Sequence, residues 1–228
     1  MRYHLDRGLQ DLKTEIGRMG AMVEESVEKT ILALKEMDGA LAVEIIGHDD
    51  EIDGMETRIE KHCMSLFALQ QPLAGDLRMI GSCLKMITDM ERIADHSADI
   101  AEITLRLVGN NSVKINPQIF HMAEMARIMV RRSIDAFINQ DLEGAEAVCR
   151  DDDAVDEYFT AIIMDLVNGI KASPDTAEWA VDVMFIVKYL ERMADHATNI
   201  SEWAVYYETG RHQHLQHPEN HVYPPEKE

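Results

Sequence analysis

The sequence has little of what membrane spans and sheet-rich folds require. Its longest unbroken apolar run is five residues, Val183 to Val187, whereas a helix that crosses a bilayer needs about 20. Aromatic residues make up only 6% of the 228 positions, and there are just 12 glycines and 6 prolines. The start, Met1 to Asp6, lacks the basic segment and the apolar stretch of a signal peptide. We therefore expect a helical protein without direct membrane insertion.

Cysteines are also scarce. Cys63, Cys83 and Cys149 are an odd number, lie far apart in the sequence and form no CxxC pair. Disulfide frameworks use even numbers of cysteines, and thiol metal sites use closely spaced pairs. A reduced, cytoplasmic setting is the simplest interpretation.

Basic residues are outnumbered almost two to one. The chain has 22 Lys and Arg against 42 Asp and Glu, which gives a net charge of −20. A surface of this sign repels the phosphate backbone of nucleic acids and anionic bilayers. The composition therefore excludes bulk nucleic-acid binding, and it favours metal cations and basic protein surfaces as partners.

Apolar periodicity predicts helices throughout. From Leu5 to Leu34 apolar residues recur at steps of three and four, so a first helix of about 30 residues should end at Asp38-Gly39. Further helices are expected at about residues 41–69, 73–108, 117–139, 142–171 and 175–208. Their limits are set by Pro72, by the Gly/Asn/Ser-rich segment 109–116 before Pro117, and by Ser173-Pro174.

The six helices fall into two sets of three, which predicts an all-α fold of two tandem three-helix bundles. The first bundle should cover residues 1–110 and the second residues 111–210, related by a pseudo-twofold internal repeat. The His- and Pro-rich tail, residues 211–228, has little apolar content and is expected to be disordered.

An internal repeat supports this division. Residues 91–102, ERIADHSADIAE, align at an offset of 100 with residues 191–202, ERMADHATNISE, and seven of the twelve positions are identical. A weaker repeat at an offset of 103 aligns residues 49–53, DDEID, with residues 152–156, DDAVD. Each half therefore has one acidic segment on its second helix and one on its third.

Helical geometry places the carboxylates of each segment in a stripe. Glu91, Asp95, Asp99 and Glu102 fall within about 80° of one another on a helix, and the second copy repeats this with Asn199 in place of Asp99. Like charges so spaced repel, and carboxylates suit hard or borderline cations. Two interpretations stay open at this point. Each half could hold a multinuclear metal site, or the stripe could be a solvated acidic face, which its direction away from the apolar side of the helix supports.

Several other residues have simpler roles. His96 and His196 lie beside the stripes, at an angle that favours hydrogen bonding on the helix surface or between helices over metal ligation. The methionines follow the apolar spacing and are expected to fill the core.

Four longer motifs are a Q-P-x-x-x-D-L-R turn at 71–78, DMERIADH at 89–96, YLERMADHATNI at 189–200 and VYYETG at 205–210. In these motifs the chain resembles the PhoU family of bacterial phosphate-signalling regulators, and the resemblance covers about residues 5 to 210. It implies two three-helix-bundle repeats, a homodimer in several relatives, and E/D-x-x-x-D motifs that hold surface clusters of iron or zinc, with manganese, nickel and magnesium as further candidates. The implied ligands are Asp49, Asp53, Glu91, Asp95, Asp99, Asp152, Asp156, Glu191, Asp195 and Asn199. The change from Asp99 to Asn199 argues against equal occupancy of the two halves.

The resemblance also implies a function. PhoU-like proteins are non-enzymatic cytoplasmic negative regulators that link the ATPase subunit of the phosphate ABC transporter to a PhoR-type sensor histidine kinase, and any membrane association is through these partners. An alternative keeps the adaptor but treats the acidic stripes as protein-docking surface without physiological metal. A ferritin-like di-iron enzyme is a remote alternative, because it needs Glu-x-x-His pairs that project into a four-helix bundle.

Overall fold

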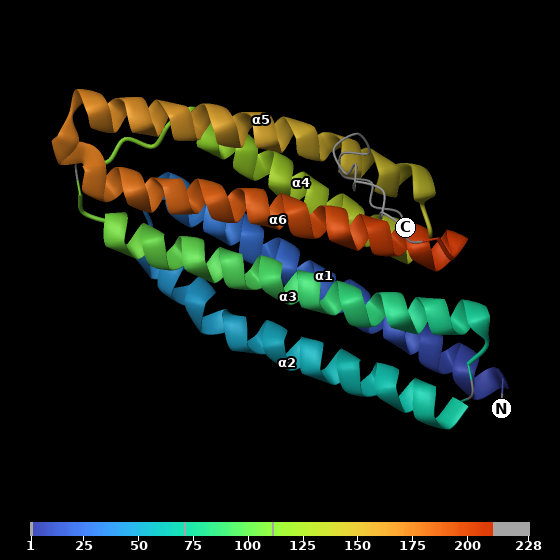
Figure 1. Ribbon diagram of the computed structural model, residues 1–228. Coiled ribbons are helices and arrows are strands. Elements are labelled where there is room, and N and C mark those ends of the chain that lie inside the picture. Colours follow the sequence, from blue (N-terminus) through green and yellow to red (C-terminus); the bar gives the residue numbers. More distant parts are fainter. Residues whose placement is uncertain (1, 71, 111, 212–228) are drawn as a thin grey trace, which may run out of the picture.

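The computed structural model describes residues 2–70, 72–110 and 112–211, and the part of the chain so described is helical with short connections (Figure 1). The predicted all-α fold is confirmed. The helices are α1 (Arg2–Glu36), α2 (Gly39–Gln70), α3 (Ala74–Leu107), α4 (Pro117–Asn139), α5 (Leu142–Ala172) and α6 (Ala177–Thr209), with a 3₁₀ turn at Pro174–Thr176 before α6. The predicted tail lies outside the described residues from position 212 onward.

Polar side chains define the helix ends where the sequence predicted them. Asp38 Oδ1 accepts from the backbone N–H groups of Ala40 (2.9 Å) and Leu41 (3.0 Å) at the start of α2. Asn116 caps α4 by accepting from the N–H of Gln118 at 2.9 Å. These bonds satisfy amides that have no partner within the first turn of a helix.

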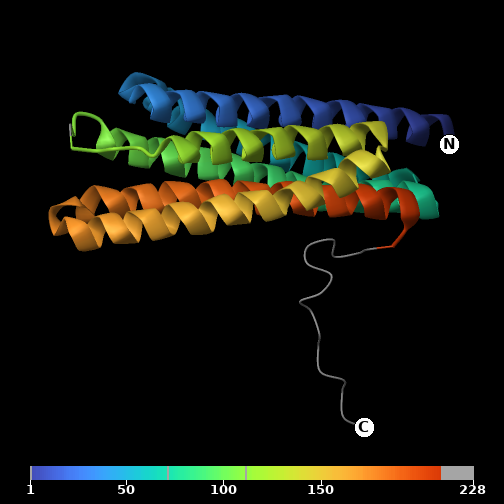
Figure 2. The same cartoon turned by 90° about the horizontal axis from the view of Figure 1, so that it is seen from above.

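The two repeats lie side by side. Helices α1, α2 and α3 pack on one another, as do α4, α5 and α6, and the two sets meet where α3 lies against α6 and α1 against α4. Figure 1 shows α3 and α6 along the middle with α2 and α5 as flanks, and Figure 2 shows α1 and α4 running alongside each other. At Gly20 a β-carbon would come within 2.8 Å of Ile134 Cγ2, so this glycine allows α1 and α4 to approach closely.

One hydrophobic core extends through both repeats. Its buried members come from all six helices and form a continuous cluster. The apolar face predicted for α3 is buried throughout, at Met86, Met90, Ile93, Ala94, Ile100 and Ala101. The division at residues 110 and 111 therefore separates two repeats of one packed unit, and whether either bundle folds by itself stays a prediction.

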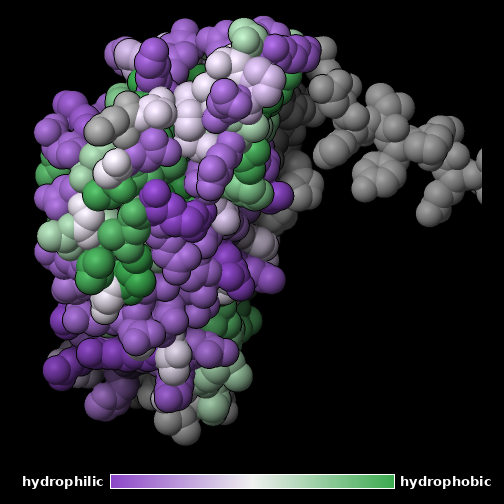
Figure 3. All heavy atoms as spheres, turned by 90° about the vertical axis from the view of Figure 1, so that its left-hand side faces the viewer, coloured by the Kyte–Doolittle hydropathy of each residue, from purple (hydrophilic) through white to green (hydrophobic). Residues whose placement is uncertain are grey.

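The outer surface is mainly polar. Figure 3 looks onto the end of the molecule where α3 connects to α4 and α5 to α6, and hydrophilic side chains cover most of it around smaller apolar areas. None of the helices in the described residues has an apolar stretch of the length and hydropathy that a membrane crossing demands.

Candidate functional site

Antiparallel packing of α2 on α3 brings the first pair of acidic segments together. One carboxylate oxygen each from Asp49 and Asp53 on α2 and Asp95 on α3 all lie within 4.8 Å of one another. No other three His, Cys, Asp or Glu side chains meet this criterion in the part of the chain that the structure describes. With Glu56 and Glu91, which lie beside these three, they form what we call the first carboxylate cluster.

Burial and mutual repulsion disfavour full ionisation of this cluster. Burial, followed by the charges of Asp95 and Asp53, raises the pKa of Asp49 from its usual 3.8 to about 6. Burial and then Asp95 raise the pKa of Glu91 from 4.5 to about 7, although Arg92 partly opposes the shift. A group of carboxylates with raised pKa values is one that a bound cation would stabilise in its ionised form.

Two carboxylate oxygens of the cluster lack hydrogen bonds. Asp49 Oδ1 and Glu91 Oε2 are buried and accept none from any described residue, although Arg92 Nε lies 3.4 Å from Glu91 Oε2. Buried polar atoms without a partner are costly and rare. The two oxygens without hydrogen bonds could bind a metal cation, and a set of ligands made of carboxylates alone is typical of sites for hard or borderline cations.

In the second repeat the charge of Asp156 on α5 acts on Asp195 on α6. We call these two residues, together with Asp152 and Glu191, the second carboxylate cluster. Asp152 is only 5% exposed, so this part of the acidic segment of α5 lies inside the protein. Burial and the charge of Glu191 raise the pKa of Asp195, whereas Lys188 and Arg192 lower it.

The two clusters differ at one pair of equivalent positions. In the first repeat Thr88 donates to Glu56 Oε1 at 3.1 Å. The equivalent residues of the second repeat are Lys188 and Phe159, and the Lys188 ammonium lies 5.2 Å from the centre of the Phe159 ring while it pairs with Glu191. The second cluster therefore has one carboxylate fewer, and its Lys188 is a cation that the first cluster lacks at the equivalent position, Thr88. Phe159 in place of Glu56 and Lys188 in place of Thr88 are visible when the two repeats are aligned residue by residue, but both lie outside the shared motifs.

Two of the predicted ligands lie at the contact between α3 and α6. Asn199 Nδ2 donates to Asp89 Oδ1 at 3.2 Å. Asp99 Oδ2 lies 3.5 Å from His96 Nδ1. Burial, followed by the charge of Asp99 and a hydrogen bond with it, raises the pKa of Tyr189 on α6. The structure thus brings together Asp49, Asp53 and Asp95, and places Asp99 and Asn199 against the neighbouring helix.

The two histidines of the repeat meet at the same contact, and the predicted hydrogen bonding between helices is confirmed for His196. His196 Nδ1 bonds to Asp89 Oδ1 across the helices at 2.8 Å. The His96 ring stacks on Tyr189 with centroids 5.2 Å apart and lies 5.6 Å from the ring of His196. These contacts join the two repeats near the middle of α3 and α6.

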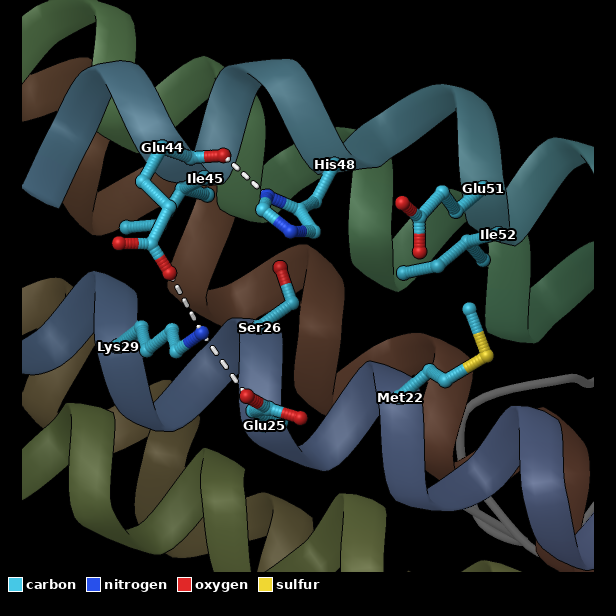
Figure 4. Close-up of a pocket in the computed structure, with 9 residues that line it drawn as sticks. All are labelled: Met22, Glu25, Ser26, Lys29, Glu44, Ile45, His48, Glu51 and Ile52. Carbon is cyan, nitrogen blue, oxygen red and sulfur yellow. Dashed lines mark hydrogen bonds and ion pairs between the residues drawn. The ribbon is translucent and has the colours of Figure 1, made fainter.

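A pocket of about 80 Å³ lies between α1 and α2 (Figure 4). Lys29 pairs there with Glu25 at 2.8 Å and Glu44 at 2.7 Å, and these ion pairs raise its pKa. His48 Nδ1 bonds to the backbone oxygen of Glu44 at 2.8 Å. No member of the first carboxylate cluster lines the pocket, and Lys29 and His48 are already engaged, so the pocket is separate from the acidic site.

The thiols are not poised as nucleophiles. All three cysteines are buried, and burial raises the pKa of Cys63 and Cys149 to about 12. Reactive cysteines need a lowered pKa and access to solvent. The sequence leaves open whether the cysteines are small buried residues or surface thiols, and the structure shows that all three are buried.

Comparisons with known proteins agree with these features. The PhoU domain matches the chain twice, over residues 16–104 and 119–204. The chain is 37% identical to the phosphate-specific transport system accessory protein PhoU homolog of Clostridium acetobutylicum, over 89% of this chain and 93% of that protein, and 36% identical to the homolog of Aquifex aeolicus, over 92% and 97%. The crystal structure of PhoU from Pseudomonas aeruginosa superposes with a TM-score of 0.88 at 30% identity, over 90% of this chain and 99% of that one. The phosphate transport system regulatory protein PhoU from Streptococcus pneumoniae gives 0.86 at 30% identity, over 92% and 99%.

Proposed function

The chain belongs to the PhoU family, and we propose that it is a non-enzymatic accessory regulator of a phosphate-specific transport system. The observation that carries the proposal is the match of both repeats to the family domain, together with relatives of nearly the same length that are named as accessory proteins of phosphate-specific transport. In the finer form of the proposal, the protein is a negative regulator on the cytoplasmic side of the membrane. It joins the ATPase subunit of a phosphate ABC transporter to a PhoR-type sensor histidine kinase and suppresses the starvation response when phosphate is ample.

The surface supports a role in binding proteins. Helices α2, α3, α5 and α6 together carry 27 acidic and ten basic residues, whereas α1 and α4 carry nine of each. Such a distribution gives the molecule one strongly acidic side, which attracts basic partner surfaces and orients their approach. The buried thiols are not placed to act as nucleophiles.

Direct binding tests the adaptor role. Full-length protein is immobilised, and the transporter ATPase subunit and the full-length sensor kinase of the same organism, the latter in nanodiscs, are passed over it in separate biolayer interferometry runs. We expect both to bind, with affinity that falls as salt rises. If neither binds at low or at physiological salt, the adaptor role is refuted.

We also propose that the first carboxylate cluster holds metal, with iron or zinc as first candidates and manganese, nickel or magnesium as others. Asp49, Asp53 and Asp95 would be the main ligands, with Glu91 and Glu56 beside them. A bound cation would offset the repulsion among these side chains and join α2 to α3. The support is the convergence of oxygens within 4.8 Å and the orphaned oxygens of Asp49 and Glu91.

Elemental analysis tests the metal proposal. Protein is loaded with zinc or manganese, desalted and measured beside the variant Glu91→Gln/Asp95→Asn, and Glu102→Gln serves as the control because Glu102 is exposed on the same helix. We expect at least one equivalent in the unmodified protein and the control, and a loss of that equivalent in the double variant. Equal metal in all three would refute the assignment.

For the second carboxylate cluster a specific observation favours the other role, a protein-docking surface without physiological metal. Lys188 pairs with Glu191 there, whereas the first repeat has the uncharged Thr88 at the equivalent position. A metal ion would have to compete with this ammonium and would find one carboxylate fewer than in the first cluster. We therefore propose weaker metal binding in the second half.

A further inference from the structure

Helices α5 and α6 form an open apolar groove on the outside of the second repeat. Its lining is Phe159, Ile163, Val181, Met184, Phe185 and Lys188, and its volume is about 350 Å³. The Phe185 side chain is 52% exposed and that of Val181 is 46% exposed. Exposed aromatic and aliphatic side chains that line one groove are typical of binding surfaces.

The first repeat has the same fold but polar or small residues at four of the equivalent positions. At the positions equivalent to Phe159 and Ile163 it has Glu56 and Glu60. Lys85 stands at the position of Phe185, and Gly81 at that of Val181. Since the first repeat forms its helix pair with polar residues here, packing within the repeat does not require apolar ones. Phe159, Ile163 and Met184 also pack against the edge of the core, but packing within the repeat does not account for the exposed side chains of Val181 and Phe185.

The groove is bordered by negative charge. The second carboxylate cluster begins one helical turn from Phe159, at Asp156, and Lys188 lies between the two features with its ammonium over the Phe159 ring. Helices α5 and α6 carry 14 acidic residues against four basic ones. A second copy of this chain would bring a surface of the same sign, so charge complementarity selects a basic partner.

We propose that the α5–α6 groove is the docking site for a basic amphipathic helix of a partner in the phosphate system. Apolar side chains of that helix pack on Phe159, Ile163 and Phe185, and its Lys and Arg side chains face the carboxylates of the same two helices. This is the helix-in-groove mode, in which residues three and four apart supply the anchors. The inference rests on the proposed adaptor function, since it states where and by what chemistry the adaptor binds.

The test repeats the binding measurements with a single change in the groove. In Phe185→Lys the second repeat takes the residue that the first repeat has at Lys85, so the change is compatible with this fold and removes an anchor. The control Met64→Lys makes the same change of charge at a methionine of α2 that is 56% exposed. We expect Phe185→Lys to weaken binding of at least one of the two partners by about tenfold or more, as loss of an interface anchor does, and Met64→Lys to change it less than twofold.

The outcomes separate the two proposals. If the unmodified protein binds and Phe185→Lys binds equally well, the groove is refuted and the adaptor function stands. If the unmodified protein binds neither partner, the adaptor function fails and the groove proposal falls with it. If sedimentation shows that Phe185→Lys converts a dimer to a monomer, a second copy occupies the groove and the proposal is wrong. Circular dichroism melting of both variants verifies that they fold, and Val181→Ser provides a second, uncharged change in the groove.

Discussion

Replacing Glu91 with glutamine should stabilise the metal-free protein at alkaline pH and leave it unchanged at acidic pH. The pKa of Glu91 is raised to about 7 in the folded protein from 4.5, so between these values the folded state binds a proton that the unfolded state has lost. The contribution of Glu91 to stability is therefore greatest below pH 4.5, decreases as pH rises toward 7, and stays low above it.

The size of the effect follows from the shift. A difference of about 2.5 pKa units corresponds to about 3 kcal/mol if it is converted in full. Glu91 is partly solvated and Arg92 lies beside it, so screening reduces the contribution, and we expect about 1 kcal/mol. Glutamine lacks the charge, so the variant should be more stable than the unmodified protein by about this amount at pH 8.

Urea unfolding of metal-depleted protein at pH 5 and pH 8 measures this difference. Glu102→Gln on the same helix is the control, and it should have no comparable effect because Glu102 is exposed. Addition of zinc at pH 8 should reverse the sign, because a cation stabilises the unmodified cluster and binds the variant less well. A Glu91→Gln protein that is less stable than the unmodified one at pH 8 without metal would refute this reasoning.

Three further predictions concern the repeats and the core. Lys188→Thr should raise the metal content of the second half and Thr88→Lys should lower that of the first, which elemental analysis of the two variants would show; no change in either would contradict the proposed asymmetry. Asp89→Ala should lower the free energy of unfolding by about 1.5–3 kcal/mol, because it removes the carboxylate that bonds to His196 and Asn199; an unchanged urea midpoint would contradict this. The three thiols should resist a thiol reagent at pH 8 in the folded protein and react in urea, because all are buried; rapid reaction without urea would argue against the described packing.

The sequence predicts the helices well because their limits are local. The positions of Pro117, Asp141 and Gly210 coincide with helix ends, where a fixed φ, a capping carboxylate and a left-handed φ of 72° respectively are required. Apolar steps of three and four likewise identify the buried side of each helix. These features depend on the residues of one helix alone.

The site is predicted less completely because it depends on which helices are neighbours. A helical projection places Glu91, Asp95 and Asp99 in one stripe, but it does not say that Asp95 faces α2 whereas Asp99 reaches Tyr189 on α6. Burial of Asp152 also follows from packing between helices and not from its spacing. The pair Phe159 and Lys188 is visible in the sequence as a break in the repeat, and its meaning becomes clear once the structure shows that the two side chains are in contact.

The most direct test of the regulatory function is expression of phosphate-starvation genes in a strain that lacks this protein. A reporter for such a gene is measured in cells grown with ample phosphate, with and without a plasmid that supplies the unmodified protein. We predict high reporter activity in the deletion strain and repression when the protein is restored. Normal repression in the deletion strain would contradict the proposal that this protein is a negative regulator of the phosphate response.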